Sequence, residues 1–202
     1  MVSVTNGEIG SETLPPDEIS AIRKKEGEAA AKVIGAEYIW MGFQDQRFLI
    51  DNDVRVAFID LFRYVNPDVT ISHFPDDFSG DHRLVGRIAN DIALLPMAPN
   101  IKTKNECIHK RPVHFFADSA MNIGFQPDEY VDITEEIDAK RQMLLCHKTQ
   151  DDWTKYHCGS SIVDNEEIIS RFRGLQVNVR HAEAFLKVKV FPRFPYGEVL
   201  PY

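Results

Sequence analysis

Residues 69–86 read VTISHFPDDFSGDHRLVG and place a strand, a polar loop and the start of a helix in direct succession. The β-branched and apolar run at 69–72 predicts a strand. Apolar residues at helical spacing over 84–95 predict a helix that ends before Pro96. The loop at 73–82 carries two histidines and three aspartates. Its position between a strand and a helix makes this stretch one repeat of an alternating α/β pattern.

The same alternation occurs upstream of this stretch. We predict strands at 2–5 and 37–41, and helices at 15–35 and 51–66 that begin at Pro15-Pro16 and at a cap formed by Asp51 or Asn52. A strand–helix–strand alternation implies parallel strands with helices packed on the faces of the sheet. The first half of the chain therefore predicts an α/β fold with a mostly parallel sheet and helices on both faces.

The second half of the chain is less regular. We predict strands at 113–116 and 185–190, a strand at 130–133 that leads to a helix capped by Thr134, and a helix at 166–172. No repeat, low-complexity tract or linker interrupts the sequence. We therefore expect residues 1–202 to form a single domain.

The composition excludes several classes of function. The 202 residues are 44% hydrophobic and carry a net charge of −8, which argues against sequence-independent binding to nucleic acid. No Lys/Arg cluster would hold an anionic membrane surface, and no apolar run approaches the length of a membrane span. Three widely spaced cysteines fit a reducing compartment, so we expect a cytoplasmic protein.

The loop at 73–82 is the main candidate for chemistry. In an open α/β sheet, ligands bind outside the carboxyl ends of the strands, and this loop lies at such an end. The positive N-terminus of the following helix disfavours a protonated His82, and a neutral imidazole is what a metal ligand requires. Asp81 can cap the helix or orient a neighbouring group. The alternative is a polar loop whose aspartates only cap the helix.

Several motifs in this order resemble the LmbE-like, or PIG-L-like, zinc-dependent N-deacetylases. The matching segments span nearly the whole chain: TNGEIG at 5–10, Arg23-x-x-Glu26 with AA at 29–30 and IG at 34–35, GFQD at 42–45, HFPDDFSGDHR at 73–83, PDEYVDIT at 127–134, LLCHKTQ at 144–150 and AEAF at 182–185. The resemblance implies a Rossmann-like fold and hydrolysis of an N-acetyl group from an amino sugar, such as N-acetylglucosamine, or from a related small molecule.

The resemblance also suggests roles for particular residues. His82 takes the position of a ligand to Zn²⁺ or another divalent metal, and Asp81 and His147 are the candidate catalytic residues. The candidate substrate-binding residues are Arg23, Asp45, His73 and Asp77. Other readings stay open: Arg23 could pair with Glu26 along a helix face, Asp45 could be a turn residue, and His147 could cap the end of a helix.

One family motif is absent from this sequence. The His-Pro-Asp-Asp motif, which supplies two zinc ligands and the general base, should lie upstream of Thr5, so we expect the chain to lack the first strand and helix of the family. His73-Phe74-Pro75-Asp76-Asp77 is not the same motif, because it follows a different strand and has an extra residue. Ser79 stands where the family often has a histidine.

Three hypotheses follow from this departure. The chain is an N-terminally incomplete deacetylase, a non-catalytic relative that binds a sugar or another small molecule, or a rebuilt metal hydrolase. In the third hypothesis His73, Asp77 and His82 converge on one ion, with Asp76 or Asp81 as base. Without its central strand the sheet should expose two edges, so we also expect low stability or a homo-oligomer.

Overall fold

The computed structural model describes residues 1–119 and 123–189 and divides the chain into two units, each with its own helices and strands. Unit 1 comprises Met1–Phe48 and Asp132–Glu183. Unit 2 comprises Leu49–Val131 and the residues from Ala184 onward. Within the described residues, no helix is long and apolar enough to cross a membrane.

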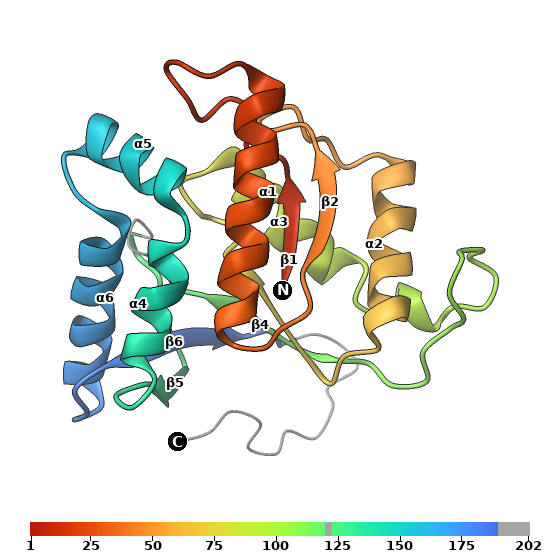
Figure 1. Cartoon of the computed structure of the whole chain (residues 1–202). Coiled ribbons are helices and arrows are strands. Elements are labelled where there is room, and N and C mark those ends of the chain that lie inside the picture. The colour runs from red at the N-terminus through yellow and green to blue at the C-terminus, as the bar shows by residue number, and fades with distance from the viewer. Residues whose placement is uncertain (120–122, 190–202) are drawn as a thin grey trace. The chain divides into compact units, whose positions relative to one another are not determined.

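Unit 1 combines a two-stranded parallel sheet with four helices. Strand β1 (Val2–Thr5) pairs with β2 (Ile39–Phe43), and α1 (Pro16–Val33) connects them. Helices α4 (Ile137–Leu145), α5 (Lys148–Cys158) and α6 (Ile162–Gln176) follow later in the chain, and α4 and α5 both contact α1 (Figure 1). The unit is therefore built from two segments far apart in the sequence.

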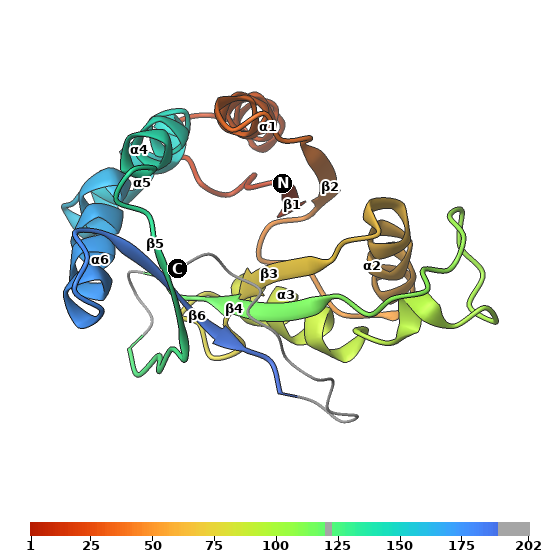
Figure 2. The same cartoon turned by 90° about the horizontal axis from the view of Figure 1, so that it is seen from below.

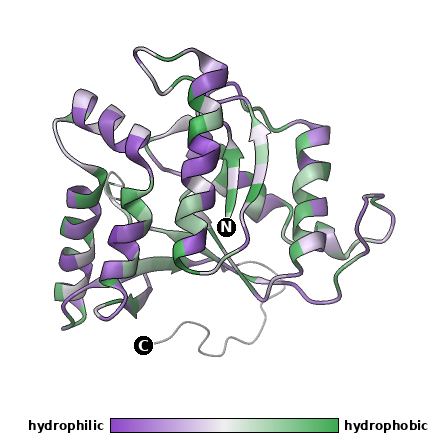
Figure 3. Ribbon diagram, viewed as in Figure 1, coloured by the Kyte–Doolittle hydropathy of each residue, from purple (hydrophilic) through white to green (hydrophobic). Residues whose placement is uncertain are grey.

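Helix α1 begins and packs as its sequence predicts. Pro15 occupies the N-cap with an extended backbone, Pro16 is the first helical residue, and the first turn is acidic, which suits the positive end of a helix. Its buried face includes Ile19, Ala30 and Ala31, each at most 1% exposed. Hydrophilic and hydrophobic residues alternate along the helix, as expected for an amphipathic element (Figure 3).

Unit 2 contains the strand–loop–helix stretch with which the sequence analysis began. It runs through α2 (Asn52–Val65), β3 (Val69–His73), α3 (Gly80–Asp91), a short 3₁₀ helix (Leu95–Met97) and β4 (Val113–Ala117). Strands β3 and β4 are parallel and in register over five residue pairs, from Val69–Val113 to His73–Ala117, and they lie side by side in Figure 2. Helix α3 packs on β3, so the loop at 74–79 leaves the carboxyl end of a parallel strand.

The sheet that contains β3 and β4 is mixed. Its strand order is β3-β4-β6-β5, in which β5 is Glu129–Asp132 and β6 is Ala182–Lys187. Strand β6 runs antiparallel to β4, with Phe116 opposite Leu186. Among the described strands, β1 and β3 each have a hydrogen-bonded neighbour on one side only.

The α/β class and most of the predicted elements are confirmed, but the sheet differs from the prediction. We expected one mostly parallel sheet, whereas the described strands form two sheets, and the β4–β6 pair is antiparallel. Sheet pairing joins residues that are distant in sequence, so local patterns do not determine it. The division into two units leaves the single-domain assignment a prediction.

Several predicted boundaries were wrong. Helix α3 begins at Gly80 rather than at residue 84, because polar residues of its first turn do not follow the apolar periodicity. Thr134 does not cap the helix that follows β5: α4 has its N-cap at Glu136. The oxygen of the Thr134 hydroxyl instead accepts a hydrogen bond from the backbone N–H of His181. Helix α5 was not predicted, and residue 190 of the last predicted strand lies outside the described residues.

His114 is a core histidine of unit 2 and is not part of the candidate site. It is 4% exposed, and its two ring nitrogens hydrogen-bond the hydroxyls of Thr70 and Ser72 at 2.7 and 3.0 Å. Burial, assisted by the charge of Arg111, lowers the pKa of His114 to about 4. The imidazole is therefore neutral in the folded protein at pH 7.

This pKa predicts a loss of stability in mild acid. The pKa of His114 is lower in the folded chain than the ordinary value of 6.5, so the unfolded chain binds the proton first and stability falls as the pH drops from 6.5 toward 4. Between pH 7 and 5 the His114 contribution amounts to about 2 kcal/mol. Urea unfolding at both pH values should show a smaller pH dependence in His114→Gln than in the wild type. An unchanged dependence would contradict the assignment, and the exposed His109→Gln is the matched control.

Candidate functional site

The loop between β3 and α3 in unit 2 brings three candidate residues together. His73 ends β3, Asp77 lies in the loop, and His82 is in the first turn of α3. One ligand atom from each residue can be chosen so that all three atoms lie within 4.8 Å of one another. The close approach of α3 to the end of β3 depends on Gly86, because a Cβ there would lie 2.4 Å from the backbone oxygen of His73.

Asp77 is the hydrogen-bonding centre of this loop. Its side chain is 1% exposed, and Oδ1 accepts hydrogen bonds from the backbone N–H of Ser79 and from Nδ1 of His82, both at 2.9 Å. Oδ2 is 3.4 Å from the hydroxyl of Ser119. The backbone oxygen of Asp77 accepts from the Arg83 guanidinium at 2.7 Å. A buried carboxylate needs such partners, because an unpaired buried charge is costly.

The Asp77 contact fixes the tautomer of His82. A carboxylate only accepts hydrogen bonds, so Nδ1 of His82 carries the proton and, in the neutral ring, Nε2 presents its lone pair. A histidine that ligates a metal commonly donates its other ring N–H to a carboxylate in this way. The contact therefore presents Nε2 of His82 in the form in which a histidine binds a metal.

His73 packs directly on His82. The two rings are parallel within 5°, with centroids 3.9 Å apart. Loss of water from the packed part of the ring, followed by the charge of His82, lowers the pKa of His73 to about 4, although the Asp77 carboxylate opposes this shift. His73 is therefore neutral at pH 7, which is the state that a metal ligand requires.

Two further aspartates flank these residues. Asp81 is buried, at 7% exposure, in the first turn of α3, whereas Asp76 is exposed. The N-cap position of α3 belongs to Ser79, whose side chain makes no capping hydrogen bond. A role for either aspartate in catalysis stays a prediction.

A second group of predicted residues gathers in unit 1 around Arg23 on α1. The guanidinium donates to the backbone oxygen of Gly10 at 3.0 Å, and the loop at 6–10 covers the side chain so closely that a Cβ at Gly10 would lie 2.1 Å from Nη2. Burial lowers the pKa of Arg23, although the charges of Asp45 and Glu26 oppose this shift. Nε of Arg23 is buried without a hydrogen-bond partner among the described residues.

Asn6 holds Asp45 near this loop. Its Oδ1 accepts hydrogen bonds from the backbone N–H groups of Asp45 and Glu8, both at 3.2 Å, and Asn6 N–H donates to the backbone oxygen of Phe43 at 2.8 Å. Asp45 is thus in a turn, as one of the open alternatives proposed, and its charge still acts on Arg23. The structure therefore brings the Arg23 and Asp45 positions together.

His147 joins the Arg23 group through the start of α5. It occupies the N-cap of that helix without a side-chain capping bond, so the expectation of a helix C-terminal cap is wrong. Burial, followed by the charge of Arg23, lowers the pKa of His147, and the carboxylate of Glu26 opposes this shift.

Glu26 is a member of the Arg23 group whose role the sequence reading missed. The carboxylate does not hydrogen-bond Arg23; it accepts from the backbone N–H of Thr149 at 2.9 Å and from the Thr149 hydroxyl at 2.7 Å. These residues are 123 positions apart, so spacing along a helix could not reveal the pair. Their presence in two of the quoted motifs was the available signal.

The Glu26–Thr149 contact predicts a stability effect. Thr149→Val keeps the shape of the side chain and removes the hydroxyl bond to a carboxylate, so the free energy of unfolding should fall by about 1–2 kcal/mol. Denaturant unfolding measures the change. Thr13→Val, at an exposed threonine whose hydroxyl makes no hydrogen bond with the described residues, should change stability by less than about 0.5 kcal/mol. Equal effects of the two variants would show that the hydrogen bond contributes nothing.

Two comparisons of the sequence with known proteins found similar sequences. The family model described as PIG-L, GlcNAc-PI de-N-acetylase, matches residues 1–93. The chain is 26% identical over 137 residues to 4-oxalmesaconate hydratase of Pseudomonas putida, a match that covers 67% of this chain and 53% of that protein. The chain thus spans about half the length of this curated relative.

Solved structures share the fold. The N,N'-diacetylchitobiose deacetylase of Pyrococcus horikoshii matches with a TM-score of 0.75 and 25% identity, over 93% of this chain and 71% of that one. The 4-carboxy-2-hydroxymuconate hydratase of Pseudomonas putida KT2440 matches with a TM-score of 0.77 and 21% identity, over 98% and 86% of the two chains. The resemblance that the motifs indicated is confirmed over residues 1–93, which match the PIG-L (LmbE-like) family model.

Proposed function

We propose that this protein is a metal-dependent hydrolase that removes an N-acetyl group from an amino sugar or a related small molecule. The observation that carries the proposal is the group His73, Asp77 and His82, which offers three ligand atoms within 4.8 Å of one another. The match of residues 1–93 to a de-N-acetylase model and the likeness to a chitobiose deacetylase support this reaction class.

The donor set suits zinc. Two imidazoles and one carboxylate are the ligands of many catalytic zinc sites, which leave a further position for water. The neutral His73, the oriented His82 and the buried carboxylate of Asp77 are in the states that a zinc site needs. A bound zinc ion would polarise the amide carbonyl and lower the pKa of a water molecule.

We assign proton transfer in this loop to the aspartates beside the group. Hydrolysis of an amide needs a base that takes the proton of water and an acid that protonates the leaving amine. Asp81 is fixed in the first turn of α3 and Asp76 is exposed to solvent, so both are candidate bases. In unit 1, His147, whose pKa is lowered by burial, is a separate candidate for proton transfer.

In unit 1, Arg23 and Asp45 are proposed to bind the substrate. A guanidinium and a carboxylate together suit hydroxyl groups of a sugar, which donate and accept hydrogen bonds. The unpartnered Nε of Arg23 leaves donor capacity for such a ligand. We further propose a cytoplasmic location, because Cys107, Cys146 and Cys158 are free thiols. We also propose that two copies associate through open strand edges.

A second candidate function is hydration of an unsaturated carboxylic acid. The curated relative with 26% identity is a hydratase, and adding water to a C=C bond also needs a base that takes a proton from water. A third possibility is that the chain is a non-catalytic relative, which would bind a sugar without releasing acetate.

Metal content tests the three-residue group. Protein grown with zinc and never chelated should hold about one zinc per chain by mass spectrometry. His73→Ala and His82→Ala should each weaken zinc binding at least about tenfold, whereas His109→Ala, at an exposed histidine of the same unit, should not. A wild-type chain without zinc, or full occupancy in both variants, would reject the group as a metal site.

Asp77→Asn separates two roles of this residue. If the carboxylate is a ligand, the variant should lose zinc as completely as His82→Ala does. If Asp77 only orients His82, the amide oxygen still accepts the Nδ1 proton and the loss should be partial.

Product analysis separates the candidate reactions. Incubation with N,N'-diacetylchitobiose should release acetate, measured with a coupled enzymatic assay, and Asp81→Asn should lower the rate at least about a hundredfold. A conjugated unsaturated dicarboxylic acid, followed by its ultraviolet absorbance, tests hydration. Loss of absorbance without any acetate release would replace the proposed deacetylase with a hydratase. If neither acetate release nor loss of absorbance occurs, the chain is best described as a non-catalytic relative that binds its ligand.

A further inference from the structure

A polar cavity of about 560 Å³ lies within unit 1, apart from the Arg23 group. It is lined by the start of α4, by α6 and by the turn that precedes β6. A volume of this size is typical of small-molecule sites. No role suggested by the family resemblance falls on its lining residues.

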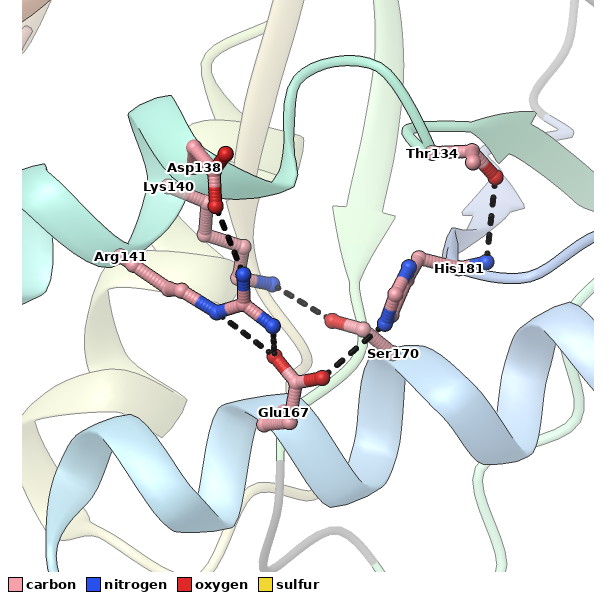
Figure 4. Close-up of polar contacts among 7 residues, drawn as sticks. All are labelled: Thr134, Asp138, Lys140, Arg141, Glu167, Ser170 and His181. Atoms are coloured by element: carbon pink, nitrogen blue, oxygen red, sulfur yellow. Dashed lines mark hydrogen bonds and ion pairs between the residues drawn. The ribbon is translucent and has the colours of Figure 1, made fainter.

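One wall of the cavity is a fixed hydrogen-bond network. Glu167 lies between Arg141 and His181: Oε2 accepts from Nε and Nη2 of Arg141 at 3.0 and 2.8 Å, and Oε1 accepts from Nε2 of His181 at 3.0 Å (Figure 4). Asp138 takes a further hydrogen bond of Arg141 at 2.7 Å. Both carboxylates are therefore already paired with cations or donors in the wall.

His181 contributes a buried acceptor. The residue is 5% exposed, and its Nδ1 is buried with no hydrogen-bond partner among the described residues. Because Nε2 donates to a carboxylate, the neutral ring presents the lone pair of Nδ1. A buried polar atom without a partner is unusual in a folded protein, and it is what a site for a ligand donor would contain.

Two guanidinium groups at the cavity are unpaired. Arg171 on α6 and Arg180 in the turn are exposed, and neither forms a hydrogen bond or ion pair with another described residue. Arg180 reaches this position because Gly174 lets the turn approach α6: a Cβ there would lie 2.7 Å from the backbone oxygen of Val179 and 2.9 Å from that of Arg180. The guanidinium fork matches carboxylate and phosphate oxygens.

The charge of the lining residues limits how much negative charge a ligand can carry. Three arginines face three carboxylates, and among the described lining residues Glu135 is the one carboxylate without a hydrogen bond or ion pair. Together with the net charge of −8, this balance disfavours a polyanion such as a nucleic acid. It suits a small anionic group held by two arginines.

We infer that this cavity binds a small oxyanion that also carries a hydroxyl group, with Arg171 and Arg180 on the anionic group and Nδ1 of His181 accepting from the hydroxyl. The chemical class includes phosphorylated polyols and hydroxy carboxylates. The inference is independent of the deacetylase proposal, because it concerns other residues and a binding measurement rather than catalysis.

Calorimetric titration with glycerol 3-phosphate and with glycerate tests the inference and separates the two anionic groups. At least one probe should bind saturably with a Kd on the order of 1 mM, whereas glycerol and sodium chloride at matched ionic strength should not bind. The Arg171→Gln/Arg180→Gln double variant should bind at least tenfold more weakly, while Arg87→Gln, at an exposed arginine of α3, should bind as the wild type does.

The imidazole of His181 provides a second measurement, which a nonspecific attraction between charges would not change. In ¹⁵N spectra of histidine side chains, the Nδ1 resonance of His181, assigned by its loss in His181→Gln, should shift as the bound probe saturates. Circular dichroism and thermal unfolding without ligand check that the double variant is folded. Absence of binding by both probes, or equal binding by the folded double variant, would overturn the inference.

Discussion

The buried carboxylate of Asp77 is the constraint on which the loop between β3 and α3 depends. The loop carries three aspartates and two histidines, and an unpaired buried charge would cost several kcal/mol. The Ser79 N–H, the His82 imidazole and the Ser119 hydroxyl repay that cost by hydrogen-bonding both carboxylate oxygens. In doing so they fix the loop backbone, the tautomer of His82 and the ring against which His73 stacks.

Local signals were sufficient for most of the helices and strands. Of the two predicted caps, Asp51 rather than Asn52 caps α2, accepting from the N–H of Val54 at 2.8 Å, and Asn66 ends that helix with a left-handed backbone. These local signals fail where a residue that is distant in sequence determines the hydrogen bond or the strand pairing. Thr134 has the side chain of a cap but instead accepts a hydrogen bond from His181, 47 residues away. The antiparallel β4–β6 pair likewise joins segments about 70 residues apart, which no local period encodes.

The two groups of candidate residues differ in how much of them the sequence could reveal. His73, Asp77 and His82 fall within ten residues, so a strand end followed by a helix start brings them together by local geometry alone. The group in unit 1 forms through a contact between α1 and α5, and its hydrogen bonds join positions 26 and 149. The motifs named residues that the structure brings together there, but Glu26 acts on Arg23 only through its charge, and its hydrogen bonds go to Thr149, which is remote in sequence.

The roles proposed for the three aspartates of this loop differ because their surroundings differ. A carboxylate that is hydrogen-bonded on both oxygens is held in one orientation by those contacts. Both oxygens of Asp77 are engaged in this way, which suits the positioning or ligand role proposed for it. Asp76 is exposed and close in sequence to the group, and Asp81 precedes His82 directly. In the proposed reaction the proton acceptor lies beside the ligand set rather than within it, so the hydrogen bonds that fix the loop stay in place when a proton moves.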